Sequence, residues 1–89
     1  MIITDHAYDR AKERCGWNRK ALERMTEKVI SHGKDCSNYA GKLKKWIDSV
    51  YFSKQTASKL LVFGNYLFIF CQGKLVTIYQ IPNYLTKGL

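Results

Sequence analysis

Three short apolar segments near the C-terminus constrain the fold more than any other feature of this chain. They span residues 60–63, 66–71 and 75–81, and only Gly64-Asn65 and Gln72-Gly73-Lys74 separate them. Segments of this length, rich in β-branched and aromatic residues and joined by such short turns, are typical of a three-stranded antiparallel meander. A sheet of this kind needs a layer of helices over its apolar side.

The preceding residues have the apolar periodicity of helices. Thr4 or Asp5 can cap a first helix that ends at Gly16, and Asn18 can cap a second helix that runs to about His32. A third, amphipathic helix is indicated farther along by apolar residues at spacings i, i+3, i+4 and i+7. These are Leu43, Trp46, Ile47 and Val50.

Together the two patterns predict one α+β domain over residues 1–89. About three N-terminal helices, over residues 5–50, are expected to pack on one face of a C-terminal antiparallel sheet of three to four strands, over residues 58–82. Trp17 and Trp46 are expected in the core. A chain of 89 residues can bury one modest core and no second one.

The charge of the chain points to an anionic partner. It carries 15 Lys and Arg against 7 Asp and Glu, a formal charge of +8. This excess favours nucleic acid, acidic proteins or anionic lipid over neutral partners. The third predicted helix is the most cationic, and its lysines are expected to follow an RNA backbone while a nearby tyrosine stacks on a base. The residues concerned are Lys42, Lys44, Lys45, Tyr51 and Tyr66.

Cysteine usage indicates the cytoplasm. Cys15, Cys36 and Cys71 are odd in number and form no C-x-x-C pair, so we expect reduced thiols. The first residues have no signal-peptide pattern, and the apolar C-terminal part is too interrupted for a membrane helix of about 20 residues. With no H-E-x-x-H or phosphate-binding glycine motif, no metal or cofactor is expected.

Two groups of side chains have the chemistry of a catalytic site. His6, Arg10 and Arg14 recur at four-residue spacing and so share one face of the first helix. Thr77 and Tyr79 are two residues apart on the last strand and share a predicted face. The other members of that face are Leu75 and Ile81, and the opposite face carries Val76, Ile78 and Gln80. The alternative is structural: a helix cap or surface role for the histidine, ion pairs for the arginines and backbone hydrogen bonds for the hydroxyls.

Three parts of the sequence resemble a known class of small phage and bacterial proteins. They are the run His6-Ala7-x-x-Arg10-x-x-x-Arg14, the pattern Gly41, Leu43 and Trp46, and the final Phe63-Gly64-Asn65-x-Leu67-Phe68-Ile69-Phe70 with Leu75-Val76-Thr77-Ile78-Tyr79 and Pro82. This set is similar to the barnase, EndoU, colicin and RelE class of metal-independent ribonucleases. The resemblance implies active-site groups from the first helix and the last strands. These would be His6, Arg10, Arg14, Thr77 and Tyr79.

RNA cleavage without a metal needs a base, a cationic group at the phosphate and an acid for the leaving oxygen. His6 suits the base or acid, the two arginines suit the phosphate oxygens, and Tyr79 suits donation to the phosphate or leaving group, with Thr77 positioning it. The product would be a 2′,3′-cyclic phosphate, and no cofactor is implied. The resemblance also implies an antitoxin-like or immunity partner.

A different class of function fits the same residues. A phage accessory protein with this fold would bind, without catalysis, a host nucleic-acid machine such as a CRISPR effector and inhibit it in the host cytoplasm. A plain module that binds RNA, or less readily DNA, is the third alternative.

Overall fold

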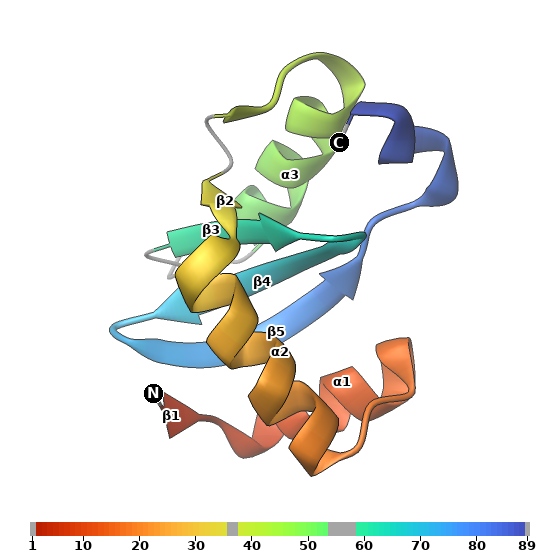
Figure 1. Ribbon diagram of the computed structural model, residues 1–89. Helices are drawn as coiled ribbons and strands as arrows, with labels where there is room; N and C mark the ends of the chain where they lie inside the picture. Colours follow the sequence, from red (N-terminus) through yellow and green to blue (C-terminus); the bar gives the residue numbers. More distant parts are fainter. Residues whose placement is uncertain (1, 36–37, 54–58, 89) are drawn as a thin grey trace.

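A mixed five-stranded sheet lies at the centre of the computed structural model, which describes residues 2–35, 38–53 and 59–88 (Figure 1). Its strand order is β1-β5-β4-β3-β2. The helices precede the long strands in the chain, as the sequence predicts, so the α+β class is confirmed.

The predicted antiparallel meander forms the middle of the sheet. It consists of β3 (Lys59–Phe63), β4 (Tyr66–Cys71) and β5 (Lys74–Gln80). Two short strands extend it: β1 (Ile2–Ile3) pairs parallel to β5, and β2 (Lys34–Asp35) pairs antiparallel to β3. These two-residue strands lie in segments that have no strand pattern in the sequence, and β1 makes the sheet mixed rather than purely antiparallel.

Turn chemistry sets the register of the meander. Gly64 has a φ of 60° and begins the turn between β3 and β4, a conformation that residues with a Cβ rarely adopt. The next turn has positive φ at both Gln72 and Gly73, as the right-handed twist of a tight hairpin requires. Both turns therefore lie where the sequence predicts them.

Helices cover both faces of the sheet. Helices α1 (Asp5–Cys15) and α2 (Arg19–His32) share one apolar cluster, whose other members include Phe68 and Ile78. Helix α3 (Gly41–Ser53) and the 3₁₀ helix η2 (Asn83–Gly88) share a second cluster on the opposite side of the strands. The expectations of one covered face and of a single core thus differ from the structure, because α3 covers the second face and forms a second apolar cluster there.

The physical reason is that β3 and β4 are apolar on both sides. Leu61 faces α2 while Leu60 and Val62 face α3, and every residue of 67–70 is at most 4% exposed. A strand that is buried on both faces has a continuous apolar run instead of an alternating one. Two layers of helices are needed to remove such a sheet from water.

A β-bulge in β5 changes which side of the sheet some of its residues face. Ile69 pairs with Thr77 whereas Phe70 pairs with Leu75, so Val76 is an extra residue. Leu75 therefore lies in the cluster of α1 and α2, and Val76 packs on the cluster of α3 with Tyr79. The predicted faces of these two residues were wrong, while Thr77, which pairs with a residue of the α3 cluster, keeps the face of Tyr79.

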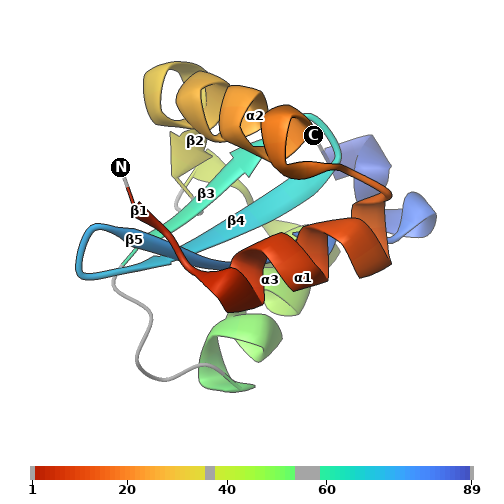
Figure 2. The same cartoon turned by 90° about the horizontal axis from the view of Figure 1, so that it is seen from below.

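Helix α1 lies along β5 at the edge of the sheet, between α2 on one side and α3 on the other (Figure 2). The predicted caps hold it there. The Thr4 hydroxyl accepts a hydrogen bond from the Ala7 backbone N–H and donates to the Leu75 carbonyl of β5, both at 3.1 Å. At the other end Gly16 has a φ of 70° and its N–H returns to the Lys12 carbonyl.

Helix α2 is joined to α1 by Tyr8. The Tyr8 hydroxyl donates to Glu23 Oε2 at 2.8 Å, and the Arg19 guanidinium lies 3.9 Å from the centre of the Tyr8 ring. The hydrogen bond to Glu23 is the main reason that the pKa of Tyr8 is raised.

We predict that Thr4→Ala lowers the free energy of unfolding by about 1–2 kcal/mol, because it removes a helix cap and the hydrogen bond to β5 together. Urea unfolding followed by circular dichroism measures this loss. Thr4→Ser keeps the hydroxyl and should stay within about 0.5 kcal/mol of the wild type. Equal losses in the two variants would show that the methyl group, and not the hydroxyl, matters.

Candidate active site at the junction of α1 and β5

Arg14 brings together three of the five predicted catalytic residues. It extends from the last turn of α1, and its Nη1 donates to the Ile78 carbonyl at 3.1 Å and to Thr77 Oγ1 at 3.4 Å. Its guanidinium carbon lies 4.2 Å from the centre of the Tyr79 ring. The helix and the strand that the resemblance joins therefore meet through this side chain.

The contact also closes an open edge of the sheet. The described part of β1 pairs only with Lys74 and Leu75, so the following residues of β5 have no strand on their outer side. Exposed strand edges carry unpaired carbonyls and N–H groups. Arg14 satisfies the Ile78 carbonyl, and Thr77, only 2% exposed, lies beneath it as an acceptor.

Two nitrogen atoms of the Arg14 side chain remain available to a ligand. Both of its hydrogen bonds use Nη1, so within the described residues Nε and Nη2 donate to no protein group. The guanidinium is half-buried, which strengthens its attraction for an anion compared with a fully hydrated charge. Arg14 can thus hold the strand edge and a phosphate oxygen at the same time.

His6 and Arg10 form a second, exposed group on α1. Arg10 Nε donates to His6 Nε2 at 3.3 Å. Arg10 Nη1 also bonds Glu13 Oε2 at 2.8 Å, the surface ion pair that is the structural alternative for this residue. The described residues give no hydrogen bond from this group to Thr77 or Tyr79, so the five residues form two groups along one helix face.

Tyr79 links the junction to α3. Its half-buried ring lies beneath Arg14 on one side and meets the Trp46 ring edge-on, with 6.5 Å between centroids. The described residues offer its hydroxyl no hydrogen-bond partner, and none of their buried side-chain polar atoms is unpaired, so this hydroxyl is reached by solvent. Tyr79 therefore lies between Arg14, a candidate catalytic residue of α1, and the basic helix α3.

The predicted RNA-binding lysines lie around a groove between α3 and η2. Lys42 and Lys45 are exposed and line about 320 Å³ of space together with Trp46, Tyr84 and Leu85. We call this the aromatic groove. Trp46, expected in the core, is half-buried at its side. The four-residue spacing of Lys42 and Trp46 is a sequence signal for this group, whereas Tyr84 has none.

The other predicted RNA-binding residues lie elsewhere. Lys44 is bound to Asp48 at 2.7 Å. Tyr66 packs half-buried on Trp17, with 4.5 Å between ring centroids, in the cluster of α1 and α2. The structure therefore separates Tyr66 from the lysines. The side chain of Tyr51 lies outside the described part of the chain.

Within the described residues, the thiols and acids form no second chemical centre. Burial raises the pKa of the Cys15 thiol, with a smaller opposing effect of the Arg14 charge, so the thiol is neutral at pH 7 and a poor nucleophile. Cys71 is half-buried, and Cys36 lies outside the described residues. Residues 2–35, 38–53 and 59–88 contain no group of three His, Cys, Asp or Glu arranged to hold a metal, and no helix long and apolar enough to cross a bilayer.

We predict that Arg14→Lys lowers the free energy of unfolding by about 1–2 kcal/mol, because an ammonium keeps the charge but loses the planar contact with Tyr79 and the guanidinium geometry that reaches Ile78 and Thr77. Urea titration of the purified variant measures the effect. The matched variant Arg10→Lys, on the exposed part of the same helix, should change stability by less than about 0.5 kcal/mol. Similar losses for both would mean that Arg14 does not hold the strand edge.

Comparisons with family models, curated proteins and solved structures found no match to this chain. Its function is therefore inferred from the arrangement of its own residues.

Proposed function

We propose that this protein binds RNA and cleaves it as a metal-independent endoribonuclease, leaving a 2′,3′-cyclic phosphate. One observation carries the proposal: Arg14 of α1 contacts both Thr77 and Tyr79 of β5. The resemblance to toxin-like ribonucleases implies an active site made from these same two elements. The site would lie on the outer side of α1 and β5, in the host-cell cytoplasm if a phage encodes the chain.

The roles of the residues follow from their positions. His6 is exposed and suits the general base at the 2′-hydroxyl, and its Nε2 would take the proton after releasing the hydrogen bond from Arg10. Arg14 has Nε and Nη2 for the non-bridging phosphate oxygens, where negative charge grows in the transition state. Tyr79 has a solvent-reached hydroxyl for the phosphate or the leaving oxygen. Thr77 is buried, so we assign it the positioning of Arg14 and no contact with RNA.

The charge distribution supports RNA as the substrate. After residue 38 the chain has seven lysines and a single acid, Asp48. Asp48 is bound to Lys44, and the exposed Lys42 and Lys45 flank the aromatic groove, which Tyr79 joins to the junction through Trp46. Phosphate contacts made by these lysines would add to the affinity for RNA without regard to its sequence.

A second candidate function is binding without catalysis, as expected of a phage accessory protein that inhibits a host nucleic-acid machine. The observation that favours it is the bond of Arg14 to the Ile78 carbonyl, which accounts for Arg14 and Thr77 by closure of the sheet edge alone. The same basic surface would then hold its partner, and an antitoxin-like protein would be one alternative occupant.

We predict that the purified protein cleaves labelled RNA in the presence of EDTA and that His6→Ala lowers the rate by about 10²–10⁴-fold, the usual contribution of a general base. Gel analysis of the products, with a test for cyclic phosphate ends, measures both. His32→Ala is the matched control, since His32 is also an exposed helical histidine but lies at the end of α2. It should cleave at the wild-type rate.

Two outcomes would contradict the enzyme. RNA that is bound but stays intact with the wild-type protein would favour the non-enzymatic binder. Equal cleavage by wild type and His6→Ala would remove His6 from the mechanism and point to a contaminating nuclease.

A further inference from the structure

We infer that the aromatic groove holds one unpaired base of a single-stranded RNA and so makes the protein selective for single strands over duplexes. RNA as the ligand rests on the proposed function; the stacking site rests on the geometry of Lys42, Lys45, Trp46 and Tyr84.

Tyr84 is presented to solvent by a fixed turn. Its side chain is 74% exposed, whereas the next residue, Leu85, is 4% exposed and packs in the cluster of α3. The Leu85 N–H donates to the Pro82 carbonyl at 2.9 Å, which holds this turn of η2. A large aromatic ring left in water on a rigid support is available to stack on a ligand.

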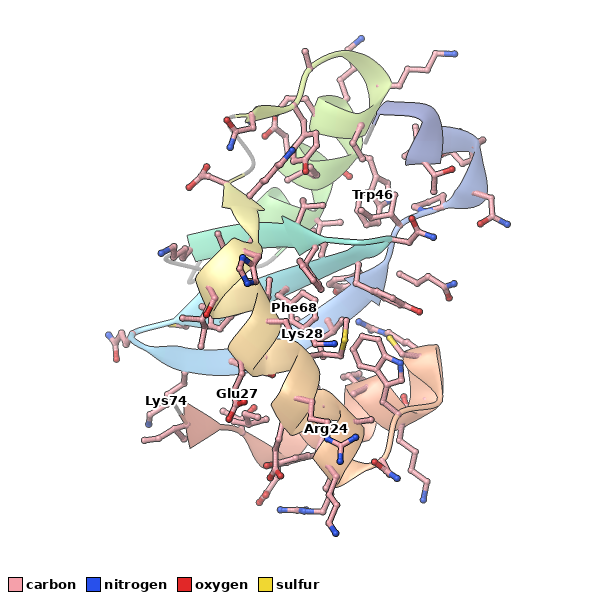
Figure 3. The ribbon with its side chains drawn as sticks, in the orientation of Figure 1. Arg24, Glu27, Lys28, Trp46, Phe68 and Lys74 are labelled. Atoms are coloured by element: carbon pink, nitrogen blue, oxygen red, sulfur yellow. The ribbon has the colours of Figure 1, made fainter. Side chains whose placement is uncertain are left out.

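Trp46 forms the second aromatic side of the groove and is equally well supported. Its neighbours on α3, Leu43 and Ile47, are buried, and its own ring rests edge-on against Tyr79. Figure 3 shows Trp46 on the side of the sheet that faces α3 and η2. The groove is open to solvent, and its space of about 320 Å³ is at the lower end of small-ligand sites, a size for one base rather than several.

Two positively charged side chains lie beside these rings. Lys42 and Lys45 are exposed and the described residues give neither of them an ion pair, because the nearby Asp48 is engaged by Lys44. Aromatic rings for base faces together with cations for the backbone are what single-stranded nucleic acid requires. A duplex keeps its base faces covered, so it can use only the cations.

The groove is linked to the proposed cleavage site through packed side chains. The Trp46 ring meets Tyr79, and the Tyr79 ring lies under Arg14. We expect a strand with one base in the groove to extend along this connection towards Arg14.

The inference is tested in full-length His6→Ala protein, so that binding is measured without cleavage. Fluorescence anisotropy is recorded with a labelled 12-nucleotide RNA, with the same RNA annealed to its complement, and with the corresponding single-stranded DNA. Adding Tyr84→Ala should weaken single-stranded RNA binding by about tenfold or more, as expected for loss of one stacked base, and should change duplex binding by less than twofold. Tyr84→Phe keeps the ring and should bind within twofold of the parent.

The lysines are tested by salt dependence. Replacing Lys42 and Lys45 with alanine should reduce the slope of log K against log salt by about 1.4, the value for two phosphate contacts on a single strand. The matched pair is Lys28→Ala with Lys74→Ala, two exposed lysines that lie away from Trp46 in Figure 3. This pair removes the same charge and should leave the slope within about 0.5 of the parent value.

Stacking has its own optical signal. The chain has two tryptophans, so Trp17→Phe leaves Trp46 as the only one. Single-stranded RNA should quench its fluorescence, and the duplex should not.

Unchanged binding by Tyr84→Ala, duplex binding as tight as single-strand binding, or no quenching of Trp46 would overturn the stacking site. Equal affinity for single-stranded DNA would support the groove and overturn its assignment to RNA. The result is separate from the enzymatic proposal, since binding without cleavage leaves the groove in place, and cleavage without an effect of Tyr84→Ala removes only the groove.

Discussion

The packing of α1 along the outer edge of β5 is the constraint on which the other features depend. In the part of the chain that the structure describes, only the two-residue β1 covers that edge, so most of β5 would expose unpaired backbone groups. Thr4, at the start of the helix, and Arg14, in its last turn, each donate a hydrogen bond to a backbone carbonyl of β5. The residues that close the edge are therefore neighbours of those that give the surface its chemistry, and stability and function share one helix.

Burial on both sides of β3 and β4 has a further consequence for the site. Because α3 lies on the opposite face from α2, and α1 lies at the edge between them, Tyr79 contacts side chains from two separate helices. A structure with all helices in one layer would leave this tyrosine exposed on an uncovered face. The three-layer arrangement instead joins an arginine-rich helix and a lysine-rich helix through one aromatic ring.

The proposed ribonuclease and the proposed single-strand groove place different demands on these residues. Catalysis would use His6 and Arg14 from two ends of one helix face, and the exposed position of His6 lets it adjust when RNA arrives. Base recognition needs rigid rings, and both Trp46 and Tyr84 are supported by buried neighbours in their own elements.

Local chemistry in the sequence determined the three α-helices and the three long strands: glycines at the two hairpin turns, Thr4 and Gly16 at the ends of α1, and the apolar periods of the helices and strands. It also determined that His6, Arg10 and Arg14 share a helix face, since that depends only on residues a few positions apart. Only the tertiary structure decided that α3 covers the second face, that the Val76 bulge moves Leu75 to the other side of β5, and that Arg14 meets Tyr79. The tertiary structure alone also decided that Tyr84 and Trp46 line the same groove. These outcomes depend on contacts between segments tens of residues apart, where register and layer are set by packing and edge closure rather than by any local preference.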